Sequence, residues 1–338
     1  MKIKDREISN NHQTFVIAEV GSNCKNDLDL AKEHISAAKS CGADAVKFQS
    51  LNMSKLYLRP SKSVVDLYQK INLDEDIHSE LKDYADKIGI TFFSSPTYLE
   101  AVDILLKLDV DLFKIASAQV GTFPRLIDKV ASTKKPTIFS TGLSNYENLA
   151  NTVNIFENYN HQDYAILHCN SLYPTPYDKV FLDRIEVYRG MFNVPIGFSD
   201  HTHGIAVILA AVALKANIIE KHFKLDEITG TPDAEFSIGV NEFSTMVSSI
   251  RAVEKSLGNK PRNTIEKDEK SFQVDISYKL VLKKRKNIGD RIMINDFDYL
   301  RDKDGIDASF DSFVAENFVF SREMEKGAII RWSDLMGF

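Results

Sequence analysis

The sequence of 338 residues, 43% apolar and 27% charged, is long enough for one large α/β domain and a small second one. A net charge of −6, a pI near 5.8 and no basic run longer than residues 283–286 exclude a typical nucleic-acid-binding protein. Residues 1–11 lack an apolar signal segment, and no stretch approaches the roughly 18 apolar residues of a membrane span. We therefore expect a cytoplasmic protein that binds neither nucleic acid nor membrane.

The first two thirds of the chain alternate short β-branched or aromatic runs with longer amphipathic segments. In residues 29–41, for example, apolar residues recur at helical spacing and Gly42 follows as a stop signal. Eight such units predict a (β/α)8 TIM barrel over residues 1–260, close to the usual length of about 250 residues. The predicted strands are 15–20, 45–50, 90–95, 112–117, 137–141, 164–169, 194–199 and 217–223.

The composition of the sequence changes after Gly258. A polar and charged stretch predicts a linker at residues 261–275. Residues 276–338 then predict a small β-rich domain that is too short for a second catalytic core. Its predicted strands are 279–282, 292–294 with Phe297, and 318–320, and its predicted turns are at Gly289 and Gly327.

The three cysteines, Cys24, Cys41 and Cys169, share no C-x-x-C spacing and are odd in number. This argues against a disulfide framework and against a zinc knuckle. We interpret them as reduced thiols that lie in the core or line a site.

Every predicted barrel strand ends in polar residues. The C-terminal ends of barrel strands meet at one rim, where active sites are built. A solvent-exposed loop would explain a polar end on any single strand. Polar ends on all eight strands, with charged residues inside otherwise apolar runs, predict an active site at this rim. The residues concerned are Glu19, Lys47, Gln49, Ser95, Lys114, Ser117, Ser140, Asn170, Ser171, Ser199, His201, Glu220 and His222.

His201 and His222 end the seventh and eighth predicted strands, so they are expected on neighbouring strands. Two imidazoles that point into the same polar rim can bind Mn, Zn or Fe, with water as the remaining ligands. A lone histidine is more often a structural residue, but the pairing of two at adjacent strand ends favours a metal site.

Lys47 and Lys114 place ammonium groups inside predicted strands, and a buried lysine requires an anion. Three interpretations remain open. The anion is a barrel carboxylate, such as that of Glu19 or Glu220. Alternatively, it is a phosphate or carboxylate substrate, or one lysine is a Schiff-base nucleophile.

Glu19 and Asp233 are the carboxylates best placed for a polyhydroxylated ligand, because carboxylates accept hydrogen bonds from sugar hydroxyls and can transfer protons. Asp233 has an equally good explanation as a turn residue.

Eight motifs, in order and in register, make the chain similar to the sialic acid synthase (N-acetylneuraminate synthase) family, which includes legionaminic and pseudaminic acid synthases. Each motif is weak alone, and the set is highly specific. The motifs are FVIAEVGSN (15–23), AVKFQ (45–49), FSSP (93–96), FKIAS (113–117), STG (140–142), HCNSLYP (168–174), GFSDHTHG (197–204) and IEKHF (219–223).

The resemblance implies a condensation in which C3 of phosphoenolpyruvate adds to the aldehyde of an N-acyl amino sugar, water attacks C2, and phosphate leaves. It implies His201 and His222 as ligands of a divalent metal, most often Mn²⁺. It implies phosphoenolpyruvate-binding roles for Lys47, Ser95, Lys114, Ser117, Ser140, Ser171 and Ser199, and sugar-binding roles for Glu19, Gln49, Tyr173 and Asp233.

Residues 279–289 and 319–335 resemble the family's small SAF (antifreeze-like) domain. Family members form domain-swapped homodimers in which this domain brings an arginine to the partner's sugar. Here that arginine is absent, and Lys279 is expected to replace it as a point charge. Further departures, at Gln119, Ala234 and Phe236, concern which sugar is used rather than the reaction.

The sequence therefore predicts a nonulosonic (sialic-type) acid synthase for surface-glycan biosynthesis. One alternative is a Schiff-base aldolase that uses Lys114 and needs no metal. The other is a non-catalytic barrel that binds a sugar or an anion, although such a protein has no physical reason to keep a cluster of buried charges.

Overall fold

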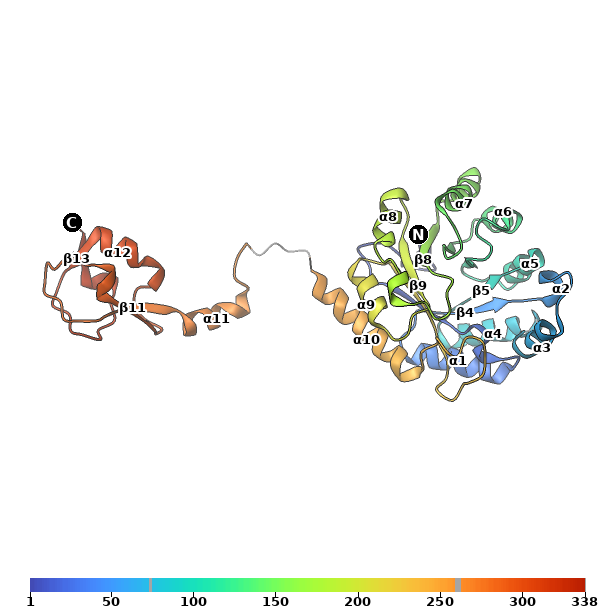
Figure 1. Cartoon of the computed structure of the whole chain (residues 1–338), viewed down its shortest axis with the longest axis horizontal. Coiled ribbons are helices and arrows are strands. Elements are labelled where there is room, and N and C mark those ends of the chain that lie inside the picture. Colours follow the sequence, from blue (N-terminus) through green and yellow to red (C-terminus); the bar gives the residue numbers. More distant parts are fainter. Residues whose placement is uncertain (73–74, 259–262, 338) are drawn as a thin grey trace. The chain divides into compact units, whose positions relative to one another are not determined.

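The computed structural model describes residues 1–72, 75–258 and 263–337. The chain divides into two compact units, residues 1–258 and 259–338 (Figure 1). The predicted domain boundary at residue 260 and the first two residues of the predicted linker, 261 and 262, lie outside the described residues.

Unit 1 is the predicted (β/α)8 barrel. Its eight parallel strands follow the chain around the barrel, and the last strand pairs with the first, in the order β5-β4-β3-β10-β9-β8-β7-β6. The two ends of this order, β5 and β6, lie next to each other. The strands are β3 (Phe15–Glu19), β4 (Ala45–Ser50), β5 (Thr91–Pro96), β6 (Phe113–Ile115), β7 (Thr137–Ser140), β8 (Tyr164–Cys169), β9 (Ile196–Asp200) and β10 (Ile218–His222).

Helices surround these strands (Figure 1). The segment predicted as a helix at 29–41 is one, and Gly42 follows it with a φ of +84°, a conformation that favours glycine. The helices of unit 1 are α1 (Leu28–Ser40), α2 (Met53–Leu56), α3 (Lys62–Ile71), α4 (Glu75–Ile88), α5 (Leu99–Lys107), α6 (Pro124–Ser132), α7 (Tyr146–Asn158), α8 (Arg184–Met191), α9 (Ala206–Ala213) and α10 (Val240–Leu257), with 3-10 turns η1 (Gly21–Cys24) and η2 (Tyr177–Lys179).

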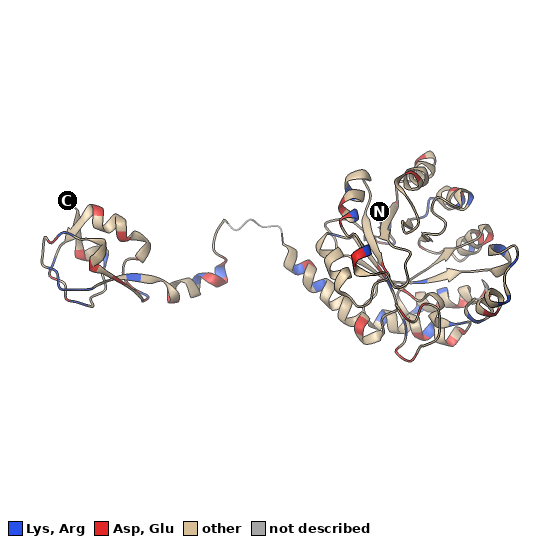
Figure 2. Cartoon of the chain, in the orientation of Figure 1, with Lys and Arg blue, Asp and Glu red and all other residues tan. Residues whose placement is uncertain are grey.

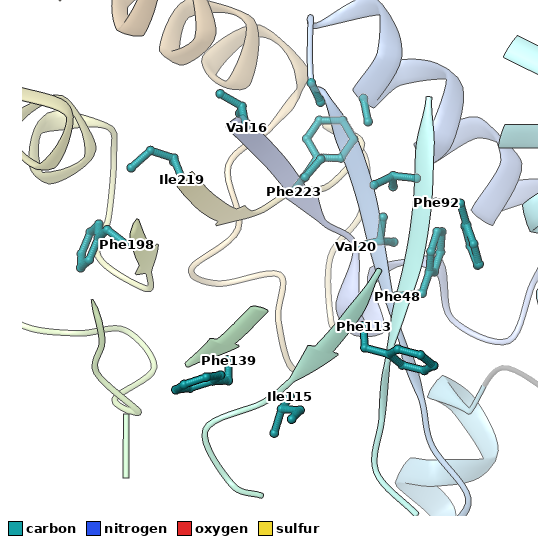
Figure 3. Packing of buried hydrophobic residues seen from close by; sticks show 14 of the residues in the cluster. Val16, Val20, Phe48, Phe92, Phe113, Ile115, Phe139, Phe198, Ile219 and Phe223 are labelled. Carbon is teal, nitrogen blue, oxygen red and sulfur yellow. The ribbon is translucent and has the colours of Figure 1, made fainter. Parts of the chain in front are cut away.

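Alternation along each strand sorts the buried side chains into two clusters. The larger cluster lies between the strands and the helices, and includes Val16, Phe48, Phe113, Phe198 and Ile219 (Figure 3). The smaller cluster fills the inside of the barrel near the start of the strands, and includes Phe15, Ile17, Phe93, Ile138 and Ile218. The next inward positions along the strands are therefore the polar residues of the rim.

A short hairpin precedes the barrel. Strand β1 (Lys2–Ile3) pairs antiparallel with β2 (Arg6–Glu7). Ile3 and Ile8 are buried in the smaller cluster, against the inward residues at the start of the strands. The hairpin thus covers the end of the barrel opposite the polar rim.

Unit 2 is small and contains two two-stranded antiparallel sheets, β11 with β12 and β13 with β14. Its core includes Leu280, Ile292, Phe297, Phe320 and Ile330. Its elements are α11 (Lys267–Ile276), β11 (Tyr278–Leu282), η3 (Ile294–Asp296), β12 (Phe297–Arg301), η4 (Ala308–Phe310), α12 (Asp311–Asn317), β13 (Phe318–Phe320), η5 (Trp332–Asp334) and β14 (Leu335–Gly337).

One prediction for this region is wrong. The predicted strand 292–294 is not one, because the buried Asp296 carboxylate accepts the backbone N–H of Met293 and closes a 3-10 turn, so that β12 begins only at Phe297. Most of the segment predicted as a linker is helical and forms α11, whose first turn carries Asp268 and Glu269, acidic residues that favour a helix N-terminus. The turns predicted at Gly289 and Gly327 are confirmed.

Acidic and basic residues are interspersed along both units (Figure 2). Among the described helices, none is long and apolar enough to cross a membrane. Cys24, Cys41 and Cys169 are free thiols, and all three are buried.

His168, in β8, makes the stability of the fold depend on pH. Burial lowers its pKa from 6.5 to about 4, although its Nε2–H donates to the carbonyl of Val180 at 2.6 Å. Between these pH values the unfolded chain binds a proton that the folded chain does not, so stability must rise with pH. The shift corresponds to about 3 kcal/mol.

We expect the free energy of unfolding to fall as the pH is lowered from 6.5 to 4, and His168→Phe to remove roughly this part of the dependence. Urea unfolding of both proteins across this pH range measures it. Equal pH slopes for the two proteins would contradict the assignment to His168.

Candidate active site

Two lysines and two glutamates form a buried charge network at the rim. Lys47 Nζ lies 2.7 Å from Glu19 Oε2 and 3.7 Å from Glu220 Oε2. Lys114 Nζ and Ser199 Oγ donate to Glu220 Oε1 at 3.0 and 2.8 Å. All four charged side chains are at most 5% exposed. The barrel carboxylates are therefore the partners of both lysines here, and Glu220 bridges them.

The network perturbs the acidity of its members. Burial, opposed by Lys47, raises the pKa of Glu19 above 4.5, so Glu19 is easier to protonate than an ordinary glutamate. Burial would also raise the pKa of Glu220, but Lys114 and Lys47 outweigh it and lower that pKa to about 2. Burial lowers the pKa of Lys114, against the attraction of Glu220. Such separated acidities are typical of sites that move protons or bind anions.

Gln49 extends the network toward the solvent side of the rim. Its Nε2 donates to Glu19 Oε1 at 2.8 Å and so orients that carboxylate. In the register of β4 and β5, Gln49 is the partner of Ser95. The Ser95 hydroxyl is buried and has no hydrogen-bond partner among the described residues. A polar ligand at this point would satisfy it.

A second cluster of hydroxyls surrounds Gly142, after β7. The backbone N–H of Gly142 donates to Ser117 Oγ at 3.0 Å. A Cβ on Gly142 would lie 2.3 Å from Ser171 Oγ, so glycine permits this close approach. The Ser140 hydroxyl is buried and, within the part of the chain that is described, lacks a partner. Small hydroxyls and N–H donors of this kind suit the oxygens of a phosphate or carboxylate.

The two predicted metal ligands lie together, with ring centroids of His201 and His222 5.2 Å apart. His201 Nδ1 lies 2.7 Å from the carbonyl oxygen of Asn170, so this nitrogen carries a proton. Burial would lower the pKa of His201, but the neighbouring Cys169 outweighs burial and raises it above 6.5. Burial and the nearby charges of His201 and Lys47 hold the pKa of His222 well below 6.5, so its ring is neutral. Neutral imidazoles are the form that binds a metal.

These residues fit a divalent metal. His222 Nδ1 is buried and accepts or donates no hydrogen bond to a described residue, and the nearest carboxylate oxygen, Asp233 Oδ2, is 3.9 Å away. Within the described residues no group of three or more His, Cys, Asp or Glu side chains could hold a metal. The chain would thus supply two nitrogens, and water or substrate the remaining ligands.

Aromatic rings enclose the two imidazoles. The Tyr173 ring centroid lies 4.3 Å from that of His201. Phe236 packs 4.8 Å from His222 and 5.1 Å from Tyr173, and is buried. Phe236 was not predicted as a site residue, because its place depends on how the loop after β10 folds back over the rim.

Asp233 joins this loop to the start of η1. Its Oδ2 accepts the backbone N–H of Ser22 at 2.7 Å, and its own N–H donates to Ser22 Oγ at 3.1 Å. A Cβ on Gly21, which has a φ of +53°, would lie 2.2 Å from the same Oδ2. Asp233 is therefore a turn residue and is also held beside His222, at the site where it was predicted to bind sugar.

Cys169 lies between the imidazole of His201 and the groups of Lys114 and Ser117. Its Sγ lies 3.9 Å from His201 Nδ1. Burial would raise its pKa, but His201, Lys114 and Ser117 outweigh burial and lower it. Cys169 was predicted only as a core or site-lining thiol, and its buried position beside His201 was found only in the structure.

The structure brings the predicted residues of the barrel to one rim, but Lys279 belongs to unit 2. There its Nζ forms an ion pair with Asp307 Oδ1 at 2.6 Å. Its role in binding substrate stays a prediction. Conversely, Glu220 was predicted only as one possible ion-pair partner of a buried lysine, and the distances show that it bridges Lys47 and Lys114.

Comparisons with known proteins agree with this architecture. Residues 34–262 match the model described as the NeuB family. N,N'-diacetyllegionaminic acid synthase of Campylobacter jejuni is 32% identical, covering 94% of this chain and 99% of that protein. Pseudaminic acid synthase of Campylobacter jejuni is 36% identical over 77% of this chain and 79% of that protein. The crystal structure of N-acetylneuraminic acid (sialic acid) synthetase from Leptospira borgpetersenii, in complex with citrate, superposes with a TM-score of 0.75. It is 30% identical and covers 80% of this chain and 94% of that chain.

Proposed function

Because the chain belongs to the NeuB family of sialic acid synthases, we propose that this enzyme condenses phosphoenolpyruvate with an N-acyl amino-sugar aldose and releases phosphate. The product is a nonulosonic acid for surface glycans, made in the cytoplasm. The observation that carries the proposal is the bridged pair of buried lysines, beside buried hydroxyls that have no hydrogen-bond partner among the described residues and two adjacent imidazoles.

Phosphoenolpyruvate is assigned to the lysines and the serine hydroxyls. Its phosphate and carboxylate would take the place of Glu220 as anions for Lys47 and Lys114, and the hydroxyls of Ser95 and Ser140 would gain partners. The N–H of Gly142, with Ser117, Ser171 and Ser199, would complete the donors. This arrangement would hold the enol carbon of phosphoenolpyruvate toward the centre of the barrel rim.

The aldose is assigned to the side of the imidazoles. Bound between His201 and His222, a divalent metal, which we take to be Mn²⁺, would polarise the aldehyde. Glu19, whose pKa is raised by burial, is placed to give or take a proton at the new hydroxyl, with Gln49 orienting it. Asp233 and Tyr173 are placed to bind the sugar hydroxyls and acyl group.

The domain of unit 2 is proposed to be of the SAF type, in a domain-swapped homodimer. Lys279 would then serve the sugar in place of the family arginine. Light scattering measures the mass of the particle in solution, and a monomer at working concentration would overturn the dimer without touching the reaction.

The reaction is tested by phosphate release from phosphoenolpyruvate with Mn²⁺, with and without a chelator. The panel of aldoses contains N-acetylmannosamine, its 6-phosphate, and the diacetamido-trideoxy sugars of the legionaminic and pseudaminic type. Chelator-sensitive release with one of them supports the proposal and identifies the sugar. No release with any of them, in protein that binds Mn²⁺, would favour a non-catalytic barrel.

The lowered pKa of Lys114 also suits a Schiff-base aldolase, since an amine must lose its proton to attack a carbonyl. Borohydride with pyruvate would then label Lys114 covalently, and chelators would have no effect. The ion pair with Glu220 favours a cationic lysine and therefore the condensation.

A further inference from the structure

Lys221 lies between the two site residues Glu220 and His222 but faces the other way. Alternation directs Glu220 and His222 into the barrel and Lys221 out, toward the layer that contains Phe198 and Ile219. There the Lys221 side chain is 0% exposed, as is that of Asp200. The condensation proposed above uses neither group.

Lys221 holds both neighbours of His201. Its Nζ donates to Asp200 Oδ2 at 2.7 Å and to the carbonyl oxygen of Thr202 at 2.5 Å. Asp200 in turn accepts the N–H of Thr202 at 3.0 Å and its hydroxyl at 3.1 Å. These four hydrogen bonds close a small ring around residue 201. We call Lys221, Asp200 and Thr202 the clamp.

The clamp sits where the barrel pairing of β9 and β10 ends. Lys221 and Asp200 are partners in the last recorded rung of this pair, directly before His222 and His201. Beyond this rung the two strands no longer pair with each other. The His222 carbonyl accepts the backbone N–H of Ile238, and the His201 carbonyl accepts that of Thr175. The clamp is thus the side-chain link between the two strands at the point where their imidazoles are presented.

Stability alone does not account for an ion pair in this layer. Removing two charges from water costs several kcal/mol each, and apolar residues of similar size are often equally stable or better. The surrounding layer is apolar. What an ion pair adds over apolar packing is fixed direction, through short, charge-assisted hydrogen bonds.

We propose that Lys221, with Asp200 and Thr202, sets the separation of the two imidazoles and thereby the affinity of the site for a divalent metal. The proposal rests on the metal site of the proposed function. The clamp residues touch neither the metal site nor the substrates, so they are positioning residues that act through His201 and His222.

The test measures the affinity of the full chain for Mn²⁺ by the electron paramagnetic resonance signal of free Mn²⁺. The variant Lys221→Met/Asp200→Asn removes both charges together, so that neither is left buried alone. We expect 10- to 100-fold weaker Mn²⁺ binding, the usual effect of losing groups that orient metal ligands. Turnover should recover as Mn²⁺ is raised to saturation, because the substrate-binding groups are intact.

A matched control lies in unit 2, where Lys286 and Asp296 form another buried pair, with Nζ 2.5 Å from Oδ2. Lys286→Met/Asp296→Asn should leave Mn²⁺ affinity unchanged. Affinity within twofold of the parent in the Lys221→Met/Asp200→Asn protein would overturn the clamp. If that variant does not fold, Thr202→Val decides, since it removes only one hydroxyl donor. We expect about threefold weaker binding from it, and an unchanged affinity would overturn the proposal.

Crystal structures of the metal-free parent and variant separate this proposal from the proposed function. A parent that binds no Mn²⁺ at its histidines would contradict the proposed metal site. The clamp is then judged on geometry alone. A changed separation of the imidazoles, from 5.2 Å, supports it, and an unchanged one overturns it.

Discussion

His222→Ala is expected to abolish turnover, by on the order of a thousandfold or more in kcat/KM. The substitution removes one of the two imidazole nitrogens available to a metal, and no third His, Cys, Asp or Glu group within the described residues can replace it. Metal content and phosphate release, measured on the same preparation, test the prediction. Both should fall together.

His203 provides the control, because it lies in the same loop as His201 but is exposed. His203→Ala should keep metal content and rate. If His222→Ala retained activity with unchanged metal content, His222 would not be a ligand, and the assignment of the site would fail.

Lys114→Met is expected to weaken phosphoenolpyruvate binding by about 30- to 5,000-fold. Truncating one partner of a buried charge pair costs roughly 2–5 kcal/mol, much of it from the charge left behind. Here the loss has two parts, because Lys114 is the proposed anion ligand and also a partner of Glu220 at 3.0 Å. Equilibrium binding of phosphoenolpyruvate without sugar measures the total.

Lys114→Met/Glu220→Gln separates the two parts, since it leaves no uncovered carboxylate. Binding should recover only partly if the lysine contacts the anion. Full recovery would mean that Lys114 serves Glu220 alone. Lys129→Met, which removes an ion pair with Asp103 outside the barrel, should leave binding unchanged.

The barrel could be predicted because all of its strands share one sequence pattern, a short apolar run that ends in polar residues. Each of the eight predicted strands is confirmed within about two residues, since apolar inward and outward positions define a strand locally. The rim was predictable for the same reason, because side-chain direction follows from alternation. Lys47 and Lys114 were correctly expected to meet anions, and the carboxylates of Glu19 and Glu220 were among the partners considered.

What the sequence could not supply are contacts made by irregular segments. The packing of Phe236 on His222 depends on the loop between β10 and α10, which has no periodicity to interpret. Charge runs are ambiguous in the same way. The charge run at residues 266–270 was predicted as part of a linker without a helix, and most of it begins α11, because acidic residues also favour helix N-termini.

The hairpin of β1 and β2 has a kinetic consequence. With Ile3 and Ile8 covering one end and apolar side chains filling the barrel behind them, the described residues of the barrel block access to the site from that end. Under the proposed reaction, two substrates and two products therefore have to enter and leave at the rim. Whichever substrate sits deeper has to arrive first, so we expect initial-rate kinetics of a compulsory-order, sequential pattern rather than random entry.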